Sequence, residues 1–349
     1  ASDAHGVPRQ SASTVRHSVE FHSLDGEEPY LLEGIAEDAH LIDQTRDHDW
    51  TDYPVGIMWV LRNERIEYGG LDVAITGDVP QGAGLSSSAA IEVSVAGAFR
   101  DAFNLQIDSV ALAKLCQRAE NEFVGVQCGI MDQFASALSV RDHALLIDCR
   151  SLVHEAVPLR LAAAGLTIVI ANSGVRRELI ASAYNDRRRE CEAAVSELRQ
   201  RLERPQLLSL RDVTVADLER TNIDTIPMRR ARHAVTVIAR VAATVDALQR
   251  DDFDAVGRLV VESHLSLRDD YEVSSRELDL LVGLATAQDY VLGARLTGAG
   301  FGGCTVNLVR TDAIDAFASD VIAPYRERTG ILAVMYATSP QDGLRTWRL

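Results

Sequence analysis

A glycine- and serine-rich run at residues 78–93, DVPQGAGLSSSAAIEV, restricts the folds open to this chain. It follows a strand-like segment, LDVAITGDV at 71–79, and leads into apolar residues at helical spacing from 86 to 103. Small residues let the backbone approach an anion, and the unpaired N–H groups at a helix start favour one. The run therefore predicts a strand, a phosphate-binding loop and a helix in that order, although Gly and Ser also form plain turns and helix caps.

The charge of the chain narrows the classes of ligand. Its formal net charge is −16 at pH 7, and no basic stripe is interleaved with aromatic residues, so nucleic acid is not an expected partner. Lys114 is the only lysine, and it lies in a helix-like stretch remote in sequence from the loop. Phosphate binding must therefore use arginine, backbone N–H groups or a metal ion.

Length and cysteine content bound the architecture and the compartment. A chain of 349 residues is expected to fold as two lobes. No apolar run is long enough to cross a bilayer. The five cysteines are scattered without a CxxC pair, which indicates buried thiols rather than a disulfide framework or a zinc site. We expect a cytoplasmic protein that does not insert into membranes.

Hydrophobic periodicity predicts further elements. Strand patterns occur in TVRHSVEFHSL, HALLIDC, GLTIVIANS and ILAVMYA, and helical patterns in TDYPVGIMWVL, RARHAVTVIARVAATVDAL and LDLLVGLAT. Asp108 is expected to cap a helix that runs to about Glu122, and a long charged helix is expected from Arg176 to Arg204. No repeat or low-complexity linker separates the predicted lobes, so the second is expected to begin near residue 150.

Three motifs resemble those of the GHMP kinases. PQGAGLSSSAA at 80–90 is similar to the phosphate loop that this family uses in place of a Walker motif, and CGIMDQF at 128–134 resembles its galactokinase branch. LTGAGFGGCTVNLV at 296–309 is similar to the third family motif, with Ala299 in place of a glycine. The resemblance implies an α+β, two-lobed GHMP kinase fold with a truncated N-terminus. Its N-terminal lobe (1–150) would be related to ribosomal protein S5 domain 2-like folds, and its C-terminal lobe (151–349) would be ferredoxin-like.

The resemblance also assigns roles to residues. It makes Asp132 the catalytic carboxylate, with Glu120 and Ser88 as ligands of Mg²⁺. The ATP-binding residues would be Gly82, Ala83, Gly84, Leu85, Ser86, Ser87 and Ser88 around the phosphates, with Trp50 and Tyr53 beside the adenine. Gly129, Asp132 and Tyr184 would contact the sugar. Gly298, Gly300, Gly302 and Gly303 would form a supporting loop that packs against the phosphate loop.

The activity implied by the resemblance is ATP-dependent phosphorylation of α-D-galactose at O1, giving galactose 1-phosphate, by a cytoplasmic monomer. Such a transfer needs an in-line hydroxyl, neutralised phosphates and a proton acceptor. A carboxylate with an ordinary pKa near ~4 is ionised at pH 7 but is a weak base. Asp132 would therefore either accept the proton late or orient the hydroxyl, and the hard oxygens of Ser88 and Glu120 suit magnesium.

One motif of the galactokinase branch is missing from the printed sequence. Its GRVNLIGEHTDYNGG pattern supplies an arginine beside the catalytic aspartate and the groups that recognise the sugar hydroxyls. TRDHDWTDY at 45–53 echoes it only superficially. A fragment is one explanation, and little galactose turnover is then expected from this chain. Natural loss of the motif is the other explanation, and the protein would then be a nucleotide-binding relative that no longer phosphorylates sugar. The alternatives to a galactokinase are a kinase for arabinose, galacturonate or N-acetylgalactosamine, or a non-catalytic sugar and ATP sensor. The complete GLSSSAA run favours an enzyme.

Overall fold

The computed structural model of the protein describes residues 19–23, 30–32, 50–80, 84–175, 180–221 and 225–347. In these residues the chain divides into two compact units. The first contains the described residues up to Asp78, then Ser88–Leu138 and the end of the chain from Leu344. The second contains Val79–Ser87 and Ser139–Gly343. The sequence predicts that the second lobe begins near residue 150. These compact units are not the lobes defined by the family motifs, so that boundary stays a prediction.

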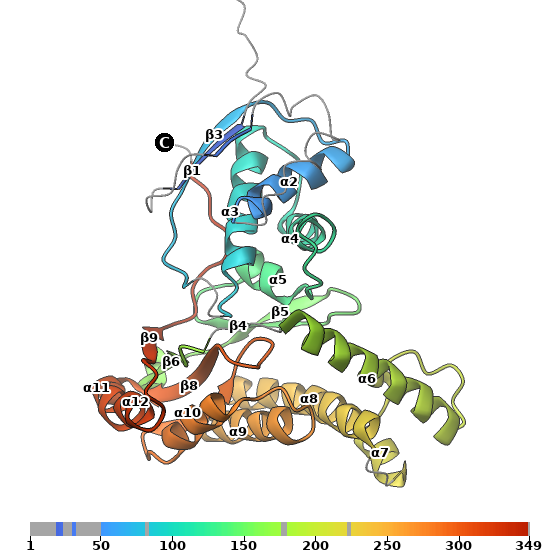
Figure 1. Ribbon diagram of the computed structural model, residues 1–349, viewed down its shortest axis with the longest axis vertical. Coiled ribbons are helices and arrows are strands. Elements are labelled where there is room, and N and C mark those ends of the chain that lie inside the picture. Colours follow the sequence, from blue (N-terminus) through green and yellow to red (C-terminus); the bar gives the residue numbers. More distant parts are fainter. Residues whose placement is uncertain are drawn as a thin grey trace, which may run out of the picture. The chain divides into compact units, whose positions relative to one another are not determined.

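The first unit combines a small sheet with helices. Strand β1 (Val19–Ser23) pairs antiparallel with β2 (Tyr30–Leu32) and parallel with β3 (Leu71–Ile75). The helical elements are α2 (Asp52–Asn63), α3 (Ser87–Ala102), α4 (Ser109–Arg118), the π-helical turn η1 (Ala119–Val124) and α5 (Met131–Leu138) (Figure 1). The predicted order of strand, loop and helix from β3 to α3 is confirmed.

Helix packing in the first unit depends on apolar faces and one close approach. Phe99, Phe123 and Phe134 are fully buried. A Cβ atom on Gly56 of α2 would lie 3.2 Å from the Phe123 ring, so glycine lets α2 lie close to η1. Asp108 caps α4 by accepting a 2.7 Å hydrogen bond from the N–H of Ala111, as predicted. The helix does not continue regularly to Glu122, because it changes to π geometry after Arg118.

The second unit is built on a four-stranded antiparallel sheet of order β7-β8-β6-β9. Its strands are β6 (Leu166–Asn172), β7 (Val291–Leu296), β8 (Cys304–Arg310) and β9 (Val334–Thr338), and a separate hairpin joins β4 (His143–Ile147) to β5 (His154–Pro158). The four-stranded antiparallel sheet with helices along it agrees with the α+β class that the motifs imply.

Seven α-helices and four short helical turns belong to the described part of this unit. They are α6 (Ile180–Arg201), α7 (Val215–Thr221), α8 (Ile226–Gln249), α9 (Phe253–Asp269), α10 (Arg276–Thr286), α11 (Ile314–Phe317) and α12 (Ala323–Thr329), with η2 (Ala162–Ala164), η3 (Leu210–Asp212), η4 (Thr311–Ala313) and η5 (Ala318–Ile322) as short turns. Helices α8 and α9 lie side by side (Figure 1), and α9 and α10 both contact β7. A Cβ atom on Gly257 would lie 2.0 Å from the carbonyl oxygen of Leu292, so the backbones of α9 and β7 touch.

The cysteines only partly fit the expectation. Cys116 and Cys304 are buried and Cys128 and Cys191 are half-buried, but Cys149 is exposed, so the prediction of five buried thiols was wrong for Cys149. This residue lies in the turn between β4 and β5, where connecting residues face solvent. Among the helices that the structure describes, none has both the length and the apolar content needed to cross a membrane.

Candidate active site

The predicted phosphate loop ends at a helix N-terminus. Helix α3 begins at Ser87, and its first turn contains no acidic residue. Gly84 and Ser86 have φ angles of 73° and 62°, which places both in the left-handed region. A serine is uncommon there, and such conformations gather at ligand sites. The N–H groups of the first turn have no partner within the helix and can bind an anion. Gly82 and Ala83 lie outside the described residues.

The aromatic residues expected beside adenine lie at the start of α2. Trp50 and Tyr53 are both half-buried. Burial, together with the nearby carboxyl groups of Glu120 and Glu92, raises the pKa of Tyr53 to about 12. The hydroxyl of Tyr53 therefore stays protonated at neutral pH and lies near these two acidic side chains. Its predicted contact with adenine stays a prediction.

A hydrogen-bonded turn precedes Asp132. The turn η1 ends at Gly125, which has a φ of 88° and donates its N–H to the carbonyl of Glu120 at 2.9 Å. The side chain of Asn121 accepts a 2.7 Å hydrogen bond from the N–H of Cys128. A π turn of this kind is rare and often marks a functional site. These contacts fix the backbone that leads through Gly129, an exposed residue, into α5.

Asp132 lies in the first turn of α5 and is half-buried. The alternative interpretation of this stretch, a helix C-terminus with a capping aspartate, is therefore wrong. At a helix N-terminus the macrodipole and the unpaired N–H groups favour an ionised carboxylate. Asp132 thus lies at the N-terminal end of α5, and its predicted role as the catalytic carboxylate stays a prediction.

A buried pair of carboxyl groups lies beside this helix. Glu92 of α3 is fully buried and Glu120 of η1 is 5% exposed. The amide nitrogen of Gln133, the residue after Asp132, donates hydrogen bonds to Glu120 at 2.6 Å and to Glu92 at 3.2 Å. The thiol of Cys128 donates to Glu120 at 3.2 Å. Gln133 thereby links α3, η1 and α5 around Glu120.

The buried position of Glu92 changes its protonation. Burial, together with the neighbouring Glu120 carboxylate, raises the pKa of Glu92 to about 9, although the hydrogen bond from Gln133 lowers it. Glu92 is therefore protonated at neutral pH. Sequence reasoning missed both Glu92 and Gln133. The signal for Glu92 was present, since it is an acidic residue on the face of α3 that also carries Ala89, Val93 and Ala96.

The side chains present fit a magnesium ion only as part of a larger set of ligands. Within the described residues no group of three His, Cys, Asp or Glu side chains could hold a metal. Glu120 and Ser88 offer hard oxygens, and Glu92 Oε1 and Gln133 Oε1 are buried without a hydrogen-bond partner in the described structure. Magnesium in kinases takes few protein ligands and fills its octahedral shell with phosphates and water. A magnesium ion that is also bound to the phosphates of a nucleotide therefore suits these oxygen ligands.

The glycine loop of the second unit needs glycine at several positions. The φ angles are 73° at Gly298, 84° at Gly300, 127° at Gly302 and 83° at Gly303. A Cβ atom on Gly300 would lie only 2.1 Å from the carbonyl oxygen of Val273. Ala299, which stands where the family motif has glycine, does not have a positive φ. Its methyl group therefore does not strain the backbone.

The remaining predicted residue is Tyr184, which lies in α6. Its side chain lies outside the described part of the chain. Asp132, Glu120 and Gly129 lie in the first unit, and the four glycines lie in the second. The predicted contact between the glycine loop and the phosphate loop stays a prediction.

Comparisons with known proteins agree with the motifs. Residues 52–139 match the GHMP kinases N terminal domain, and residues 244–327 match the GHMP kinases C terminal domain. The chain is 42% identical to the galactokinase of Clostridium beijerinckii over 301 residues, which covers 86% of this chain and 77% of that protein. It is 46% identical to the galactokinase of Roseiflexus sp. over 312 residues, which covers 88% of this chain and 78% of that protein.

Solved structures give the same picture. The galactokinase of Lactococcus lactis complexed with galactose is 34% identical, with a TM-score of 0.85, and the match covers 94% of this chain and 83% of that chain. A mevalonate kinase is 18% identical, with a TM-score of 0.63 and coverage of 94% and 87%, a likeness that shows the fold alone. The chain belongs to the GHMP kinase family of phosphotransferases and, within it, to the galactokinase branch.

Proposed function

We propose that the protein transfers the γ-phosphoryl group of ATP to O1 of α-D-galactose, giving galactose 1-phosphate and ADP. The observation that carries this proposal is the identity of 42% and 46% with galactokinases over more than four fifths of the chain. The likeness to a galactokinase complexed with galactose supports the choice of sugar.

In the proposed reaction a bond forms between O1 of the sugar and the γ-phosphorus, while the bond from that phosphorus to the β–γ bridging oxygen breaks. The proton of the O1 hydroxyl leaves towards Asp132, which either accepts it late or orients the hydroxyl. The N–H groups from Leu85 to Ser88 at the start of α3 would bind the phosphates. Trp50 and Tyr53 would lie beside adenine, and Gly129 and Tyr184 beside the sugar.

The proposed metal is magnesium, with Glu120 and Ser88 as its protein ligands. Bound with ATP, it neutralises charge on the phosphate oxygens during transfer. Gln133 and Cys128 orient the carboxylate of Glu120 through the hydrogen bonds that it accepts. Glu92, being protonated, adds no second negative charge beside Glu120 at neutral pH.

We also propose that the protein is a cytoplasmic monomer. Light scattering after size-exclusion chromatography would check the oligomeric state.

The substitution Asp132→Ala tests the assignment of the catalytic carboxylate. We expect kcat for galactose to fall about 10³-fold, because a positioned proton acceptor contributes roughly 10²–10⁴. The Kd for Mg·ATP, measured by calorimetry, should change less than about threefold, because Asp132 acts on the acceptor. The matched control is Asp254→Ala, since Asp254 is an exposed aspartate in the first turn of α9. An Asp132→Ala protein that keeps most of its turnover would contradict the assignment.

The acceptor sugar is tested by comparing kcat/KM for galactose, arabinose, galacturonate and N-acetylgalactosamine. We expect galactose to be preferred. A higher kcat/KM with one of the other sugars would replace galactose as the substrate. Binding of Mg·ATP and galactose without ADP formation would instead indicate a sensor.

A further inference from the structure

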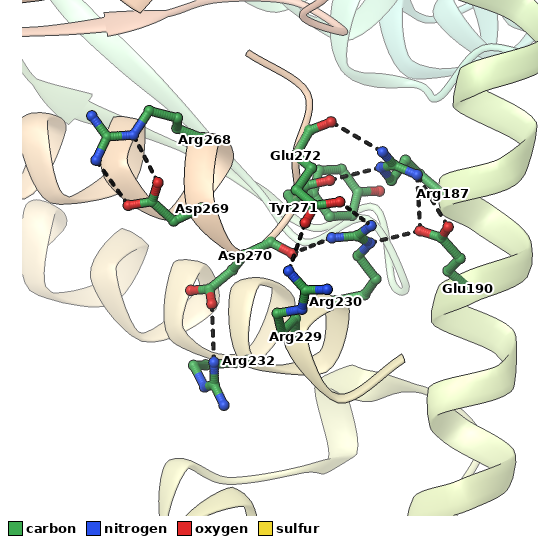
Figure 2. Close-up of polar contacts among 10 residues, drawn as sticks. All are labelled: Arg187, Glu190, Arg229, Arg230, Arg232, Arg268, Asp269, Asp270, Tyr271 and Glu272. Carbon is green, nitrogen blue, oxygen red and sulfur yellow. Dashed lines mark hydrogen bonds and ion pairs between the residues drawn. The ribbon is translucent and has the colours of Figure 1, made fainter. Parts of the chain in front are cut away.

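A network of charged side chains in the second unit centres on Arg230 of α8 (Figure 2). Arg230 is 1% exposed, and its guanidinium donates three different hydrogen bonds. Nε donates to Glu190 of α6 at 2.6 Å, Nη2 to the carboxylate of Glu272 at 2.8 Å, and Nη1 to the carbonyl oxygen of Asp270 at 2.5 Å. One buried cation therefore joins α6, α8 and the segment between α9 and α10.

A second arginine, Arg187, binds the same segment. Arg187 of α6 donates to the carbonyl oxygen of Tyr271 at 2.7 Å and to that of Glu272 at 3.0 Å, and it pairs with Glu190 at 3.0 Å (Figure 2). The carbonyl oxygens of three consecutive residues, 270–272, are thus bound by two guanidinium groups. Glu272 has a φ of 54°, a left-handed conformation that costs free energy in a glutamate. The arginine contacts offset this cost and fix the backbone.

Val273, which follows this segment, contacts the glycine loop at residues 298–303. The carbonyl oxygen of Val273 accepts a 2.7 Å hydrogen bond from the N–H of Phe301. The same oxygen lies so close to Gly300 that an added Cβ atom would be only 2.1 Å away. Tyr271 and Phe301 both pack against one apolar cluster, made of Leu267, Val273, Leu278 and Leu296. A shift of residues 270–273 would therefore move the loop from 298 to 303.

We propose that Arg230 is a positioning residue for the nucleotide site, acting through residues 270–273 on the glycine loop. The proposal rests on the proposed function, because the role of this loop beside the phosphates comes from the galactokinase resemblance. Buried ion pairs are weak evidence of stability, since desolvation offsets much of their attraction. The planar fork of arginine instead holds three acceptors in a fixed arrangement. Among the described side chains, Arg230 forms its hydrogen bonds with Glu190, Asp270 and Glu272, none of which is assigned to the sugar or to phosphoryl transfer.

The test is the variant Arg230→Lys, which keeps the charge but not the fork. We expect the Kd for Mg·ATP and the KM for ATP to rise about tenfold, while the KM for galactose changes less than about twofold. Hydrogen exchange at residues 298–303 should become faster. Glu272→Gln serves as a second variant, since it loses only the carboxylate charge and keeps the backbone contacts to Arg187. It should shift the Kd for Mg·ATP in the same direction.

Two neighbouring arginines supply matched controls. Arg268 pairs with Asp269 and Arg232 with Asp270 in half-exposed or exposed ion pairs (Figure 2). Arg268→Lys and Arg232→Lys should leave the Kd for Mg·ATP unchanged, because neither arginine contacts the carbonyl groups of residues 270–272 in the described structure.

Two results would overturn the inference. One is a folded Arg230→Lys protein with unchanged affinity for Mg·ATP. The other is an equal loss of affinity for Mg·ATP and for galactose, which a general loosening of the unit would give. Because Mg·ATP binding is measured without turnover, failure to phosphorylate galactose would count against the proposed function alone. An ATP affinity that does not respond to Arg230→Lys would count against this inference alone.

Discussion

At the scale of single residues, Glu92 shows how burial changes the chemistry of a side chain. It lies on the buried face of α3, and the amide of Gln133 lies between it and Glu120. Two ionised carboxylates so close together in a region of low dielectric would repel each other strongly. Burial and the neighbouring Glu120 therefore raise the pKa of Glu92 to about 9, and Glu92 keeps its proton at neutral pH.

Replacing Glu92 with glutamine should change how stability depends on pH. The unfolded chain loses this proton above the ordinary pKa of 4.5, whereas the folded chain keeps it up to about 9. The wild-type free energy of unfolding therefore falls as pH rises between these values, by up to about 1.4 kcal/mol per pH unit from this group. Glutamine does not titrate. We expect the stability of Glu92→Gln relative to wild type to increase from pH 5 to pH 8.

Urea denaturation at pH 5, 6.5 and 8, without nucleotide or magnesium, measures this difference. The control is Glu122→Gln, because Glu122 is a glutamate of the neighbouring turn η1 with its side chain 50% exposed. Its stability difference from wild type should stay nearly constant over this range. If the Glu92→Gln and wild-type stabilities run parallel with pH, Glu92 is ionised in the folded protein.

At the scale of elements, the glycine loop after β7 is shaped by its neighbours. Gly300 combines a left-handed φ with close contact to the carbonyl of Val273, so glycine is required at this position for two separate reasons. Gly302 has a φ of 127°, and a Cβ atom there would lie 3.0 Å from the carbonyl oxygen of Val175. The loop is thus held between two backbone segments, at 175 and 273, that are distant in sequence.

The substitution Gly300→Ala should therefore be costly. The left-handed conformation alone costs an alanine about 1–2 kcal/mol, and the contact with Val273 adds to it. We expect a total loss of at least about 2 kcal/mol in the free energy of unfolding, measured in urea. The control is Gly283→Ala in α10, where an added Cβ atom meets nothing within 4 Å and helix propensity should add roughly 0.5–1 kcal/mol. Equal stability of Gly300→Ala and wild type would show that residue 273 moves away freely.

At the scale of the whole molecule, the second unit contains its own core. Buried clusters around Val169, Leu166 and Leu198 draw all their members from residues 144–335. The sheet of β6 to β9 and the hairpin of β4 and β5 are complete within residues 139–343. A unit that contains all the strands of its sheets and its own core has what a domain needs to fold alone.

We therefore expect a fragment of residues 139–343 to fold by itself, with one cooperative thermal transition followed by circular dichroism. A fragment of residues 151–349, which starts at the boundary expected from the sequence, lacks β4. It leaves β5 unpaired and removes Ala144 and Leu146, which pack against the core. This fragment should melt at a lower temperature. Equal melting temperatures would favour the boundary near residue 150.

Local patterns predicted much of the fold. Apolar periodicity and turn residues predicted β3, β4, β6 and β9, and also α3, α8 and α10 within a few residues. They missed β5, whose residues His154 to Glu155 are exposed and do not alternate, and the helix α9. They also missed α5, because eight residues between a turn and a loop give little periodicity.

By itself the sequence determined the family and the order of strand, loop and helix, since these depend on contiguous residues, and the role that it assigns to Asp132 stays a prediction. Only the tertiary structure decided the proton on Glu92, which depends on burial and on the neighbouring Glu120, and the contact of Arg230 with Glu272 at a separation of 42 residues. The reason is physical: propensity and turn chemistry act over a few residues, whereas desolvation and buried ion pairs depend on which distant segments pack together.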